Sequence, residues 1–339
     1  MLTDAQMESF EADGVVLVDT LSTPGGLTPT QLDDAEATWE RLVEAGVVGL
    51  SNSGPERPES LQRQKALAAD RGFVELMCHP FFESIAKQVL KTEQVRVIEL
   101  GPHHRAPSGQ AAPGPDKAQQ LWSEGAHIDF QVTSADFNAT PRRDLLAVWL
   151  WVNDVPAERG AMRILPGSHR PIMQHWDRVL TEAHKEMLPR CHGMRTHPVE
   201  GQGAYPEHIP EPPDWPYSTS EPMPVAVRRG TAQVFTQSML HSAWPNTDTE
   251  PRKGFIIAWA AAEVPVGFVQ NRCDGLRHLF PLMRASVAKW RPGREYIVPA
   301  ADEFKHFVTG YEPAWPETFI DAEEAESTGD PQVVQQPKL

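Results

Sequence analysis

Cysteine is scarce in this sequence: Cys78, Cys191 and Cys273 are the only three in 339 residues, and no CxxC pair occurs. An odd number of widely spaced cysteines does not form a disulfide framework, so we expect a reducing, cytoplasmic location. The first residues are polar and acidic, unlike a secretory signal peptide. No apolar run approaches the roughly 20 residues that a membrane helix needs, so we expect no membrane contact.

Positive charge is also in short supply. The chain has 31 Lys and Arg against 46 Asp and Glu, a net charge of −15. Nucleic acid is therefore not an expected partner, because phosphate binding needs a basic surface. The charge also disfavours, more mildly, a strongly anionic substrate such as a CoA ester, although a local basic patch can still bind one. No pattern indicates an oligomeric state.

Apolar residues make up 40% of the chain, enough for a sizeable core. Thr3 and Gln6 form a predicted capping box, and apolar residues recur at helical spacing in 30–45, 59–70 and 81–91. Short β-prone runs, which predict strands, occupy 15–18, 95–100, 145–152, 162–165, 225–227, 232–235 and 255–260. These patterns predict a mainly β fold, a double-stranded β-helix (jelly roll, cupin-like) braced by N-terminal helices.

We expect one domain over residues 1–316. Within it, the Pro- and Gly-rich segment 101–126 is predicted to be a long loop. Segment 171–223, with a helical patch near 179–187, is predicted to be a lid or insert over the site. Residues 317–339 contain six acids and one Lys, which predicts a disordered acidic tail.

Four residues indicate a chemistry. His127 and Asp129 lie two apart, and residues i and i+2 of a strand share a face. His241 lies far along the chain, and Arg252 follows it by eleven residues. Two imidazoles and one carboxylate are the facial ligand set of non-haem Fe(II) oxygenases. A guanidinium binds a carboxylate through two hydrogen bonds, so we expect Arg252 to hold the far carboxylate of 2-oxoglutarate.

Two similar patterns have a different expected role. His175 and Asp177 repeat the HxD spacing, and His184 with Glu186 gives an HxE. Both lie in or beside the predicted helical patch. Positions two apart on a helix are about 200° apart around its axis, so neither pair is expected to chelate a metal. We expect surface residues here.

Residues 145–170 resemble the core of the phytanoyl-CoA dioxygenase (PhyH-like) family of Fe(II)/2-oxoglutarate oxygenases. The shared features are Trp149, Gly160 eleven residues later, and the Pro-Gly-Ser-His-Arg turn at 166–170. The opening LTDAQMESFEADGVVLVD is similar to the usual start of that family. Residues 230–252 resemble its distal segment, where a strand carries the second His and the Arg follows.

The resemblance implies a set of cofactors and residues that hold them. It implies His127, Asp129 and His241 as ligands of Fe(II), Arg252 as the residue that holds 2-oxoglutarate, and dioxygen as co-substrate. It also implies Trp149 beside the co-substrate, although a tryptophan on a buried strand is as often core.

The chain departs from the family pattern at two positions. Thr231 stands where many relatives have Asp, and Ala243 stands where many have a small hydroxyl residue. Ser242 is adjacent and is expected to substitute in the second contact to 2-oxoglutarate. Asp129 itself favours hydroxylation or a related oxidation, because halogenating relatives have a small residue there.

The expected function is hydroxylation of an unactivated carbon of a small, polar metabolite, with release of succinate and CO2. Candidate substrate-binding residues are Gln131, Arg163 and His104, with His103 and Arg105 nearby. Each is equally compatible with a solvated surface. The family name keeps an acyl-CoA substrate open, since a fold does not determine a substrate.

Other functions fit the same residues. The same iron site can support desaturation, cyclisation or epimerisation, and nothing in the sequence separates these. A non-catalytic jelly-roll binding protein and a zinc hydrolase are alternatives of other classes, because two His and an Asp also hold zinc. The complete ligand set and Arg252 argue against both of them.

Overall fold

The computed structural model describes residues 1–47, 58–129, 132–179, 194–195, 221–262, 286 and 289. Its helices are α1 (Asp4–Asp13), α2 (Pro29–Glu44), α3 (Pro58–Ala69), α4 (Arg71–Met77), α5 (Pro80–Leu90), α6 (Pro115–Gly125), α7 (Ser134–Asn138) and α8 (His169–Val179). Its strands are β1 (Val15–Asp19), β2 (Val95–Arg105), β3 (His127–Ile128), β4 (Leu146–Trp151), β5 (Arg163–Ile164), β6 (Met194–Arg195), β7 (Met223–Pro224), β8 (Thr231–Thr236), β9 (His241–Ser242) and β10 (Arg252–Ala261).

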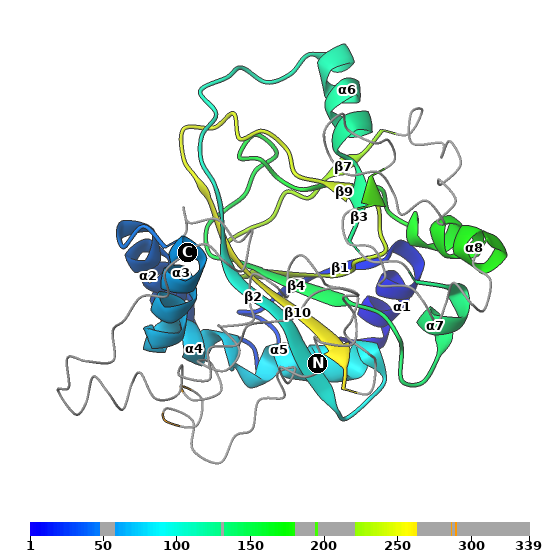
Figure 1. Cartoon of the computed structure of the whole chain (residues 1–339), viewed down its shortest axis with the longest axis horizontal. Helices are drawn as coiled ribbons and strands as arrows, with labels where there is room; N and C mark the ends of the chain where they lie inside the picture. The colour runs from blue at the N-terminus through cyan, green and yellow to red at the C-terminus, as the bar shows by residue number, and fades with distance from the viewer. Residues whose placement is uncertain are drawn as a thin grey trace, which may run out of the picture.

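The strands form two antiparallel sheets (Figure 1). We call them the large sheet, in the order β1-β8-β4-β10-β2, and the small sheet, in the order β6-β3-β9-β5-β7. Strands of the large sheet have 5 to 11 residues, whereas each strand of the small sheet has 2. Strands this short make few ladder bonds, so their position depends on the elements packed around them.

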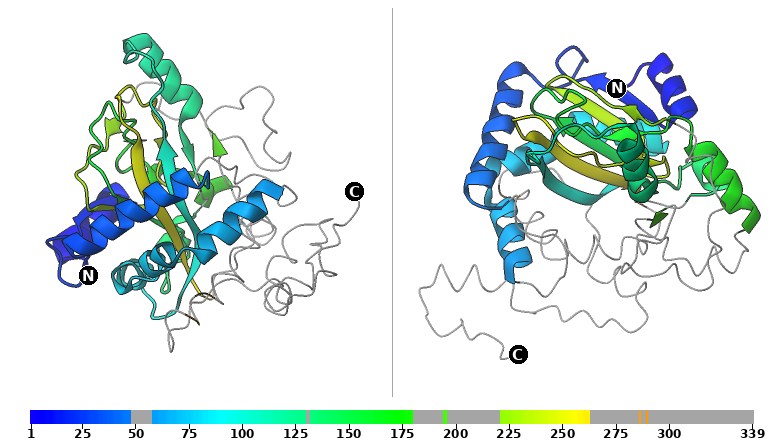
Figure 2. Two further views of the ribbon diagram at one scale, coloured as in Figure 1. Left: turned by 90° about the vertical axis from the view of Figure 1, so that its left-hand side faces the viewer. Right: turned by 90° about the horizontal axis from the view of Figure 1, so that it is seen from above.

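N-terminal helices cover one face of the large sheet (Figure 2). Leu42 of α2, Phe73 of α4 and Ile85 of α5 belong to one buried cluster with strand residues of β4, β8 and β10. Each such side chain contributes roughly 1.5–3 kcal/mol when it leaves water. The helices therefore hold the large sheet as a fixed platform.

The opposite face of the large sheet points towards the small sheet. Side chains alternate along β4: Val148 and Leu150 join the helix-facing cluster, while Trp149 and Trp151 join a second cluster. That second cluster also contains Ile164 of the small sheet. Alternation is the ordinary consequence of the pleat, which sends successive side chains to opposite faces. We call this second set of side chains the inter-sheet layer.

A third cluster covers the outer face of the small sheet. Trp122 of α6 and Trp176 of α8 pack there with Ile128, Leu240 and Trp244. All five side chains are buried. Helices α6 and α8 thus lie against the short strands, which have little stability of their own.

The N-terminal helices and the main strands agree with the sequence predictions. Thr3 and Gln6 form the expected capping box, and the predicted helices at 30–45, 59–70 and 81–91 are α2, α3 and α5. The mixture of N-terminal helices with antiparallel sheet is therefore confirmed.

The predicted loop 101–126 is confirmed for residues 106–114, which are neither helix nor strand, and was wrong at both ends. Strand β2 continues to Arg105, paired with β10, and residues Pro115–Gly125 form helix α6. Pro115 suits the first position of a helix, where its missing N–H costs nothing, and Trp122 fixes the helix by burial. Helices α4 and α7 were also not predicted.

The predicted lid at 171–223 begins inside helix α8 and ends at strand β7. Of the intervening residues, 180–193 and 196–220 lie outside the described part, as does nearly all of the predicted 179–187 patch. The predicted tail at 317–339 also lies outside the described residues.

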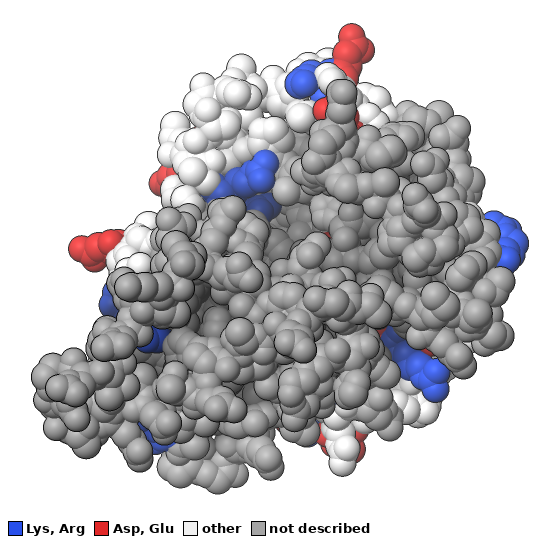
Figure 3. All heavy atoms as spheres, in the orientation of Figure 1, with Lys and Arg blue, Asp and Glu red and all other residues white. Residues whose placement is uncertain are grey.

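No helix within the described residues is both long and apolar enough to cross a membrane. Figure 3 shows one face of the molecule, on which the described Lys and Arg side chains occur in small separate groups rather than as one continuous patch.

Candidate metal centre

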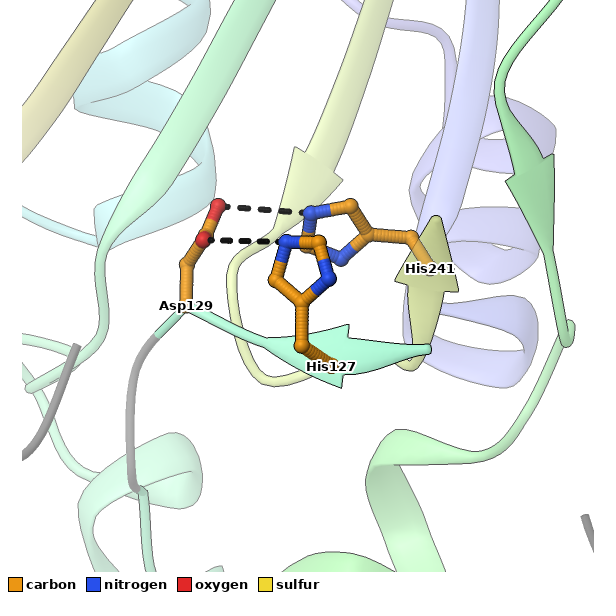
Figure 4. Close-up of side chains that lie close together, drawn as sticks. All are labelled: His127, Asp129 and His241. Atoms are coloured by element: carbon orange, nitrogen blue, oxygen red, sulfur yellow. Dashed lines mark ion pairs between the residues drawn. The ribbon is translucent and has the colours of Figure 1, made fainter. Parts of the chain in front are cut away.

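His127, Asp129 and His241 lie together (Figure 4). Each offers one ligand atom, and the three atoms lie within 4.8 Å of one another. Nε2 of His127 is 3.7 Å from Oδ1 of Asp129, and Nε2 of His241 is 3.4 Å from Oδ2. Among the described residues, this is the one group of three or more His, Cys, Asp or Glu with such geometry. The structure thus brings together the three residues that the sequence nominated.

Strand pairing produces this arrangement. His127 of β3 is the direct antiparallel partner of His241 of β9, so both side chains leave the small sheet on the same face. Asp129 lies two residues beyond His127 and shares that face, while Ile128 between them joins the outer cluster. The backbone N–H of Asp129 donates to the carbonyl of Gln237, 2.8 Å away, which fixes the end of the strand.

Both histidines are oriented in the same way. Nδ1 of His127 lies 2.8 Å from the carbonyl oxygen of Gly125, and Nδ1 of His241 lies 2.9 Å from that of Met239. A carbonyl only accepts, so each Nδ1 carries the proton and donates it. In the neutral imidazole this tautomer leaves the lone pair on Nε2, the nitrogen that faces the shared point. A backbone acceptor on the far nitrogen is the usual support of a metal-binding histidine.

The donor set fits a divalent transition metal. Asp129 is 4% exposed and His241 5% exposed, so the carboxylate has little access to water. Two imidazole nitrogens and one carboxylate oxygen on one side of a point leave the other side open to further ligands. The residues present therefore fit an Fe(II) site.

Arg252 begins β10 and points into the inter-sheet layer. Its guanidinium carbon lies 5.1 Å from the ring centre of Trp151 and 5.8 Å from that of Trp149. One Nη donates to the carbonyl of Gly160, and the other lies 3.2 Å from Nδ1 of His103. Both acceptors are neutral, and no ion pair within the described residues includes Arg252.

A buried guanidinium without an acid partner is costly. Arg252 is 1% exposed, and its Nε–H has no acceptor in the described structure. Burial, followed by the positive charge of Arg105, lowers the pKa of Arg252 to about 9, so the group is still charged at neutral pH. An anionic ligand would remove this imbalance, which is why Arg252 fits the role of carboxylate binder.

Trp149 lies in the inter-sheet layer, as its proposed pocket role requires. Its ring centre is 4.4 Å from that of His103 and 5.1 Å from that of Trp151. Its indole N–H is buried and has no acceptor in the described part. A buried indole N–H normally has a partner, so this one is available to a bound molecule.

Ser242 does not join the metal ligands. It follows His241 on β9, and successive residues of a strand face opposite ways. A Cβ on Gly125 would lie 2.7 Å from the Ser242 hydroxyl, which places Ser242 against the end of α6. The hydroxyl donates to the carbonyl of Ala243. The structure therefore places Ser242 in the outer packing, on the face opposite to that of His241.

The three candidate substrate residues have other positions. Gln131 lies outside the described residues. Arg163 pairs with Ser242 across β5 and β9 and packs over the ring of Trp244 at 4.7 Å, on the outer face of the small sheet.

His104 is the third candidate, and its ring packs 5.3 Å from that of Trp39 in the helix layer. Side chains alternate along β2, so His103 and Arg105 face the inter-sheet layer and His104 faces away from it. Neither His104 nor Arg163 therefore faces the inter-sheet layer.

The competing HxD at 175–177 lies on α8, as expected. The expectation that both residues are at the surface was wrong for one of them. His175 is buried, and burial followed by the charge of Arg178 lowers the pKa of its imidazole. Asp177 is exposed and accepts from the backbone N–H of Ser134 at 3.0 Å, so the two side chains point apart. His184 and Glu186 lie outside the described residues.

Two supporting residues were not predicted. The hydroxyl of Ser168 accepts the backbone N–H of Leu240, the residue before His241, at 2.9 Å. The carbonyl of Gly160 accepts from Arg252. Both residues belong to the sequence motifs described above. Those motifs identify the residues but do not show which atoms they hydrogen-bond.

A family model described as phytanoyl-CoA dioxygenase (PhyH) matches residues 10–254. The chain belongs to the phytanoyl-CoA dioxygenase family. Members of this family are non-haem iron enzymes that depend on 2-oxoglutarate, and the match includes the three candidate ligands and Arg252. No curated protein matches the sequence.

Several solved structures are similar to this family member at low identity. The epimerase SnoN, in complex with Fe3+, alpha ketoglutarate and nogalamycin RO, is 19% identical with a TM-score of 0.47, over 76% of this chain and 83% of SnoN. The carbocyclase SnoK from nogalamycin biosynthesis is 19% identical with a TM-score of 0.49, over 77% and 85%. HygX from Streptomyces hygroscopicus, with nickel and 2-oxoglutarate bound, is 12% identical with a TM-score of 0.43, over 77% and 87%. At this level of similarity no activity is transferred to this chain.

Proposed function

We propose that this protein is an Fe(II)/2-oxoglutarate-dependent dioxygenase that hydroxylates an unactivated carbon of a small, polar metabolite. One observation carries the proposal. His127, Asp129 and His241 converge on one point with both Nε2 atoms facing the Asp129 carboxylate, and the family match includes all three. We include a cytoplasmic setting in the proposal, because three scattered cysteines do not suit an oxidising compartment.

The residues have separate tasks. His127, Asp129 and His241 would hold the iron on one side and leave the other side for 2-oxoglutarate and dioxygen. When bound, the iron and 2-oxoglutarate supply the oxidising chemistry, which consumes dioxygen and releases succinate and CO2. Arg252 binds the far carboxylate of 2-oxoglutarate, and the buried rings of Trp149 and Trp151 keep water from that ion pair.

We also propose that the two sheets are the halves of a double-stranded β-helix. From β2 to β5 the chain alternates between large and small sheet at every strand, and it does so again from β7 to β10. This winding supports the jelly-roll prediction and explains how β3 and β9 become neighbours. The polar nature of the substrate is supported by His103 and Arg105, which face the inter-sheet layer.

Alanine variants of the ligands test the metal site. We expect His127→Ala and Asp129→Ala to lose high-affinity Mn(II) binding and to release no succinate when supplied with Fe(II), 2-oxoglutarate and oxygen, because two ligands rarely retain the ion. Asp177→Asn, at the exposed HxD, is the matched control and should keep both properties. Succinate release by either alanine variant at the wild-type rate would refute the assignment.

Arg252→Gln tests the co-substrate site separately from the metal. The amide keeps a donor but loses the charge and the two-pronged geometry, so we expect the KM for 2-oxoglutarate to rise by about tenfold or more. Mn(II) affinity should not change. An unchanged KM would remove Arg252 from this role while leaving the metal site intact.

A further inference from the structure

The sequence named His103 only as a neighbour of the candidate substrate residues, and the structure puts it beside Arg252. Strand β2 pairs with β10 so that His103 lies opposite Gly254 and Arg105 lies opposite Arg252. Paired residues share a face, so His103 points into the inter-sheet layer together with Arg252. Its neighbour His104 points to α2 instead.

Gly254 is the neighbour of His103 on β10. It lies between His103 of β2 and Trp151 of β4 in one row across the large sheet. A Cβ at this position would lie 2.8 Å from Cε3 of Trp151 and 2.9 Å from the carbonyl of Leu150. Because glycine has no Cβ, the ring of Trp151 can lie close over β10 at this row. The imidazole of His103 packs against the neighbouring Trp149, with ring centres 4.4 Å apart and planes tilted by 48°.

The hydrogen bond to Arg252 determines the tautomer of this histidine. Nη2 of Arg252 lies 3.2 Å from Nδ1 of His103. A guanidinium has donors only, so Nδ1 must be the acceptor and the imidazole must be neutral, with its proton on Nε2. The other Nη of Arg252 donates to Gly160. Two neutral acceptors on separate elements therefore fix the plane of the guanidinium without neutralising it.

We propose that His103 is a positioning residue for the 2-oxoglutarate site. Its neutral imidazole holds Arg252 in the orientation that receives the far carboxylate of the co-substrate, while Arg252 keeps its full charge for that anion. An acid in place of His103 would pair with Arg252 and compete with the co-substrate. This inference rests on the proposed function, because it assigns a role within the same site.

Calorimetric titration of 2-oxoglutarate into Mn(II)-loaded protein without oxygen tests the role. We expect His103→Leu to raise the Kd by about tenfold, as the loss of a hydrogen bond to a charged group predicts. His103→Asn should stay within about threefold of wild type, because its Oδ1 takes the place of Nδ1 as acceptor. His104→Leu is the matched control and should bind as wild type does.

Steady-state kinetics give a second measurement. His103→Leu should raise the KM for 2-oxoglutarate while kcat at saturating 2-oxoglutarate stays near that of wild type. If His103→Leu does not fold, His103→Gln replaces it, since its amide oxygen cannot occupy the Nδ1 position and the same tenfold weakening is expected.

Three results overturn the inference alone: equal Kd values for His103→Leu and wild type, an Asn variant as weak as the Leu variant, or a fall in kcat with unchanged KM. Equal Mn(II) affinity in all variants shows that the metal site is intact. A wild-type protein that binds Mn(II) but not 2-oxoglutarate overturns the proposed function, and this inference with it.

Discussion

His169 joins helix α8 to helix α1. It is fully buried, its Nε2 lies 3.3 Å from the carbonyl of Glu11, and its ring packs 5.4 Å from that of Phe137. Burial is the main reason that its pKa falls from 6.5 to about 4, and the charges of Arg170 and Arg142 act in the same direction. The hydrogen bond to Glu11 opposes the shift without cancelling it.

This shift predicts a dependence of stability on pH. The unfolded chain binds a proton at His169 below pH 6.5, whereas the folded chain does so only below about pH 4. Stability from this residue is therefore complete above pH 6.5 and falls by about 3 kcal/mol as the pH drops towards 4. Urea unfolding at pH 7 and pH 4.5 measures the loss.

His169→Gln is the matched variant for this measurement, because its amide keeps a donor towards Glu11 but does not titrate. We expect its stability to change less between the two pH values than that of wild type. An equal change in both proteins would show that other groups carry the pH dependence.

The histidines of the site show which single residues the sequence could place and which it could not. His127 and Asp129 were predicted correctly as partners because a two-residue spacing has one meaning on a strand. His104 was named as a candidate rather than His103, but the sequence could not separate the two, because the predicted strand stopped at residue 100 and no alternation was available beyond it. Gly101 and Pro102 are poor strand formers, so the sequence does not indicate that β2 continues beyond residue 100. Only the pairing with β10 shows which histidine faces the inter-sheet layer.

Among the elements, the turn at 166–169 holds strand β9. The backbone N–H of Leu165 donates to the carbonyl of Leu240 at 3.0 Å, and the N–H of Leu240 donates to the hydroxyl of Ser168 at 2.9 Å. Strand β9 has only two residues, so these two bonds are a large share of what fixes it. These two hydrogen bonds of Leu240 therefore help to fix the position of the adjacent His241.

Ser168→Ala should therefore weaken the metal site through the strand. The change leaves the buried N–H of Leu240 without its acceptor, which costs about 1–3 kcal/mol of unfolding free energy. We expect a comparable loss in chemical denaturation and a weaker affinity for Mn(II), measured by titration. Ser22→Ala, at an exposed hydroxyl, is the control and should change neither quantity. Wild-type Mn(II) affinity in Ser168→Ala would show that β9 is held by other contacts.

Helix α6 marks the limit of prediction for elements. Its sequence, PDKAQQLWSEG, follows a long Pro- and Gly-rich stretch, so composition indicated a loop. The helix is stabilised by tertiary contacts, because Trp122 is buried against Trp176, Leu240 and other residues from distant segments. Local composition carries no information about such partners. Strand β4, in contrast, is a continuous apolar run and was predicted well, and the apolar part of β10 contains the predicted strand 255–260.

For the whole molecule, the candidate site connects distant parts of the chain. Asp129 and His127 follow α6, whereas His241 belongs to the last third, and in the described structure β3 and β9 share a single cross-strand pair. A metal ion bound to all three would tie these segments together in the folded state only. Ligands that bind the folded state alone raise its stability in proportion to the logarithm of their concentration.

We therefore expect Mn(II) and 2-oxoglutarate together to raise the unfolding temperature of the protein. At concentrations about 100 times the Kd, one ligand adds about 2.7 kcal/mol of stability. Thermal melts followed by circular dichroism measure the effect, and Asp129→Ala should show almost none of it. A rise of the same size in Asp129→Ala would place the binding elsewhere.

Family membership was predictable from separate motifs that agree in order, and the match over residues 10–254 confirms it. The substrate was not predictable in the same way. Of the three residues nominated for it, two face away from the inter-sheet layer and one lies outside the described residues.

The oxygens that orient His127 and His241 are main-chain atoms, each two residues before its histidine. A substitution of Met239 exchanges the side chain but leaves that carbonyl in place. A mutation at this position can therefore change the packing nearby without removing the hydrogen bond that orients the imidazole. Because main-chain atoms orient the metal ligands, few single amino-acid substitutions can remove these contacts.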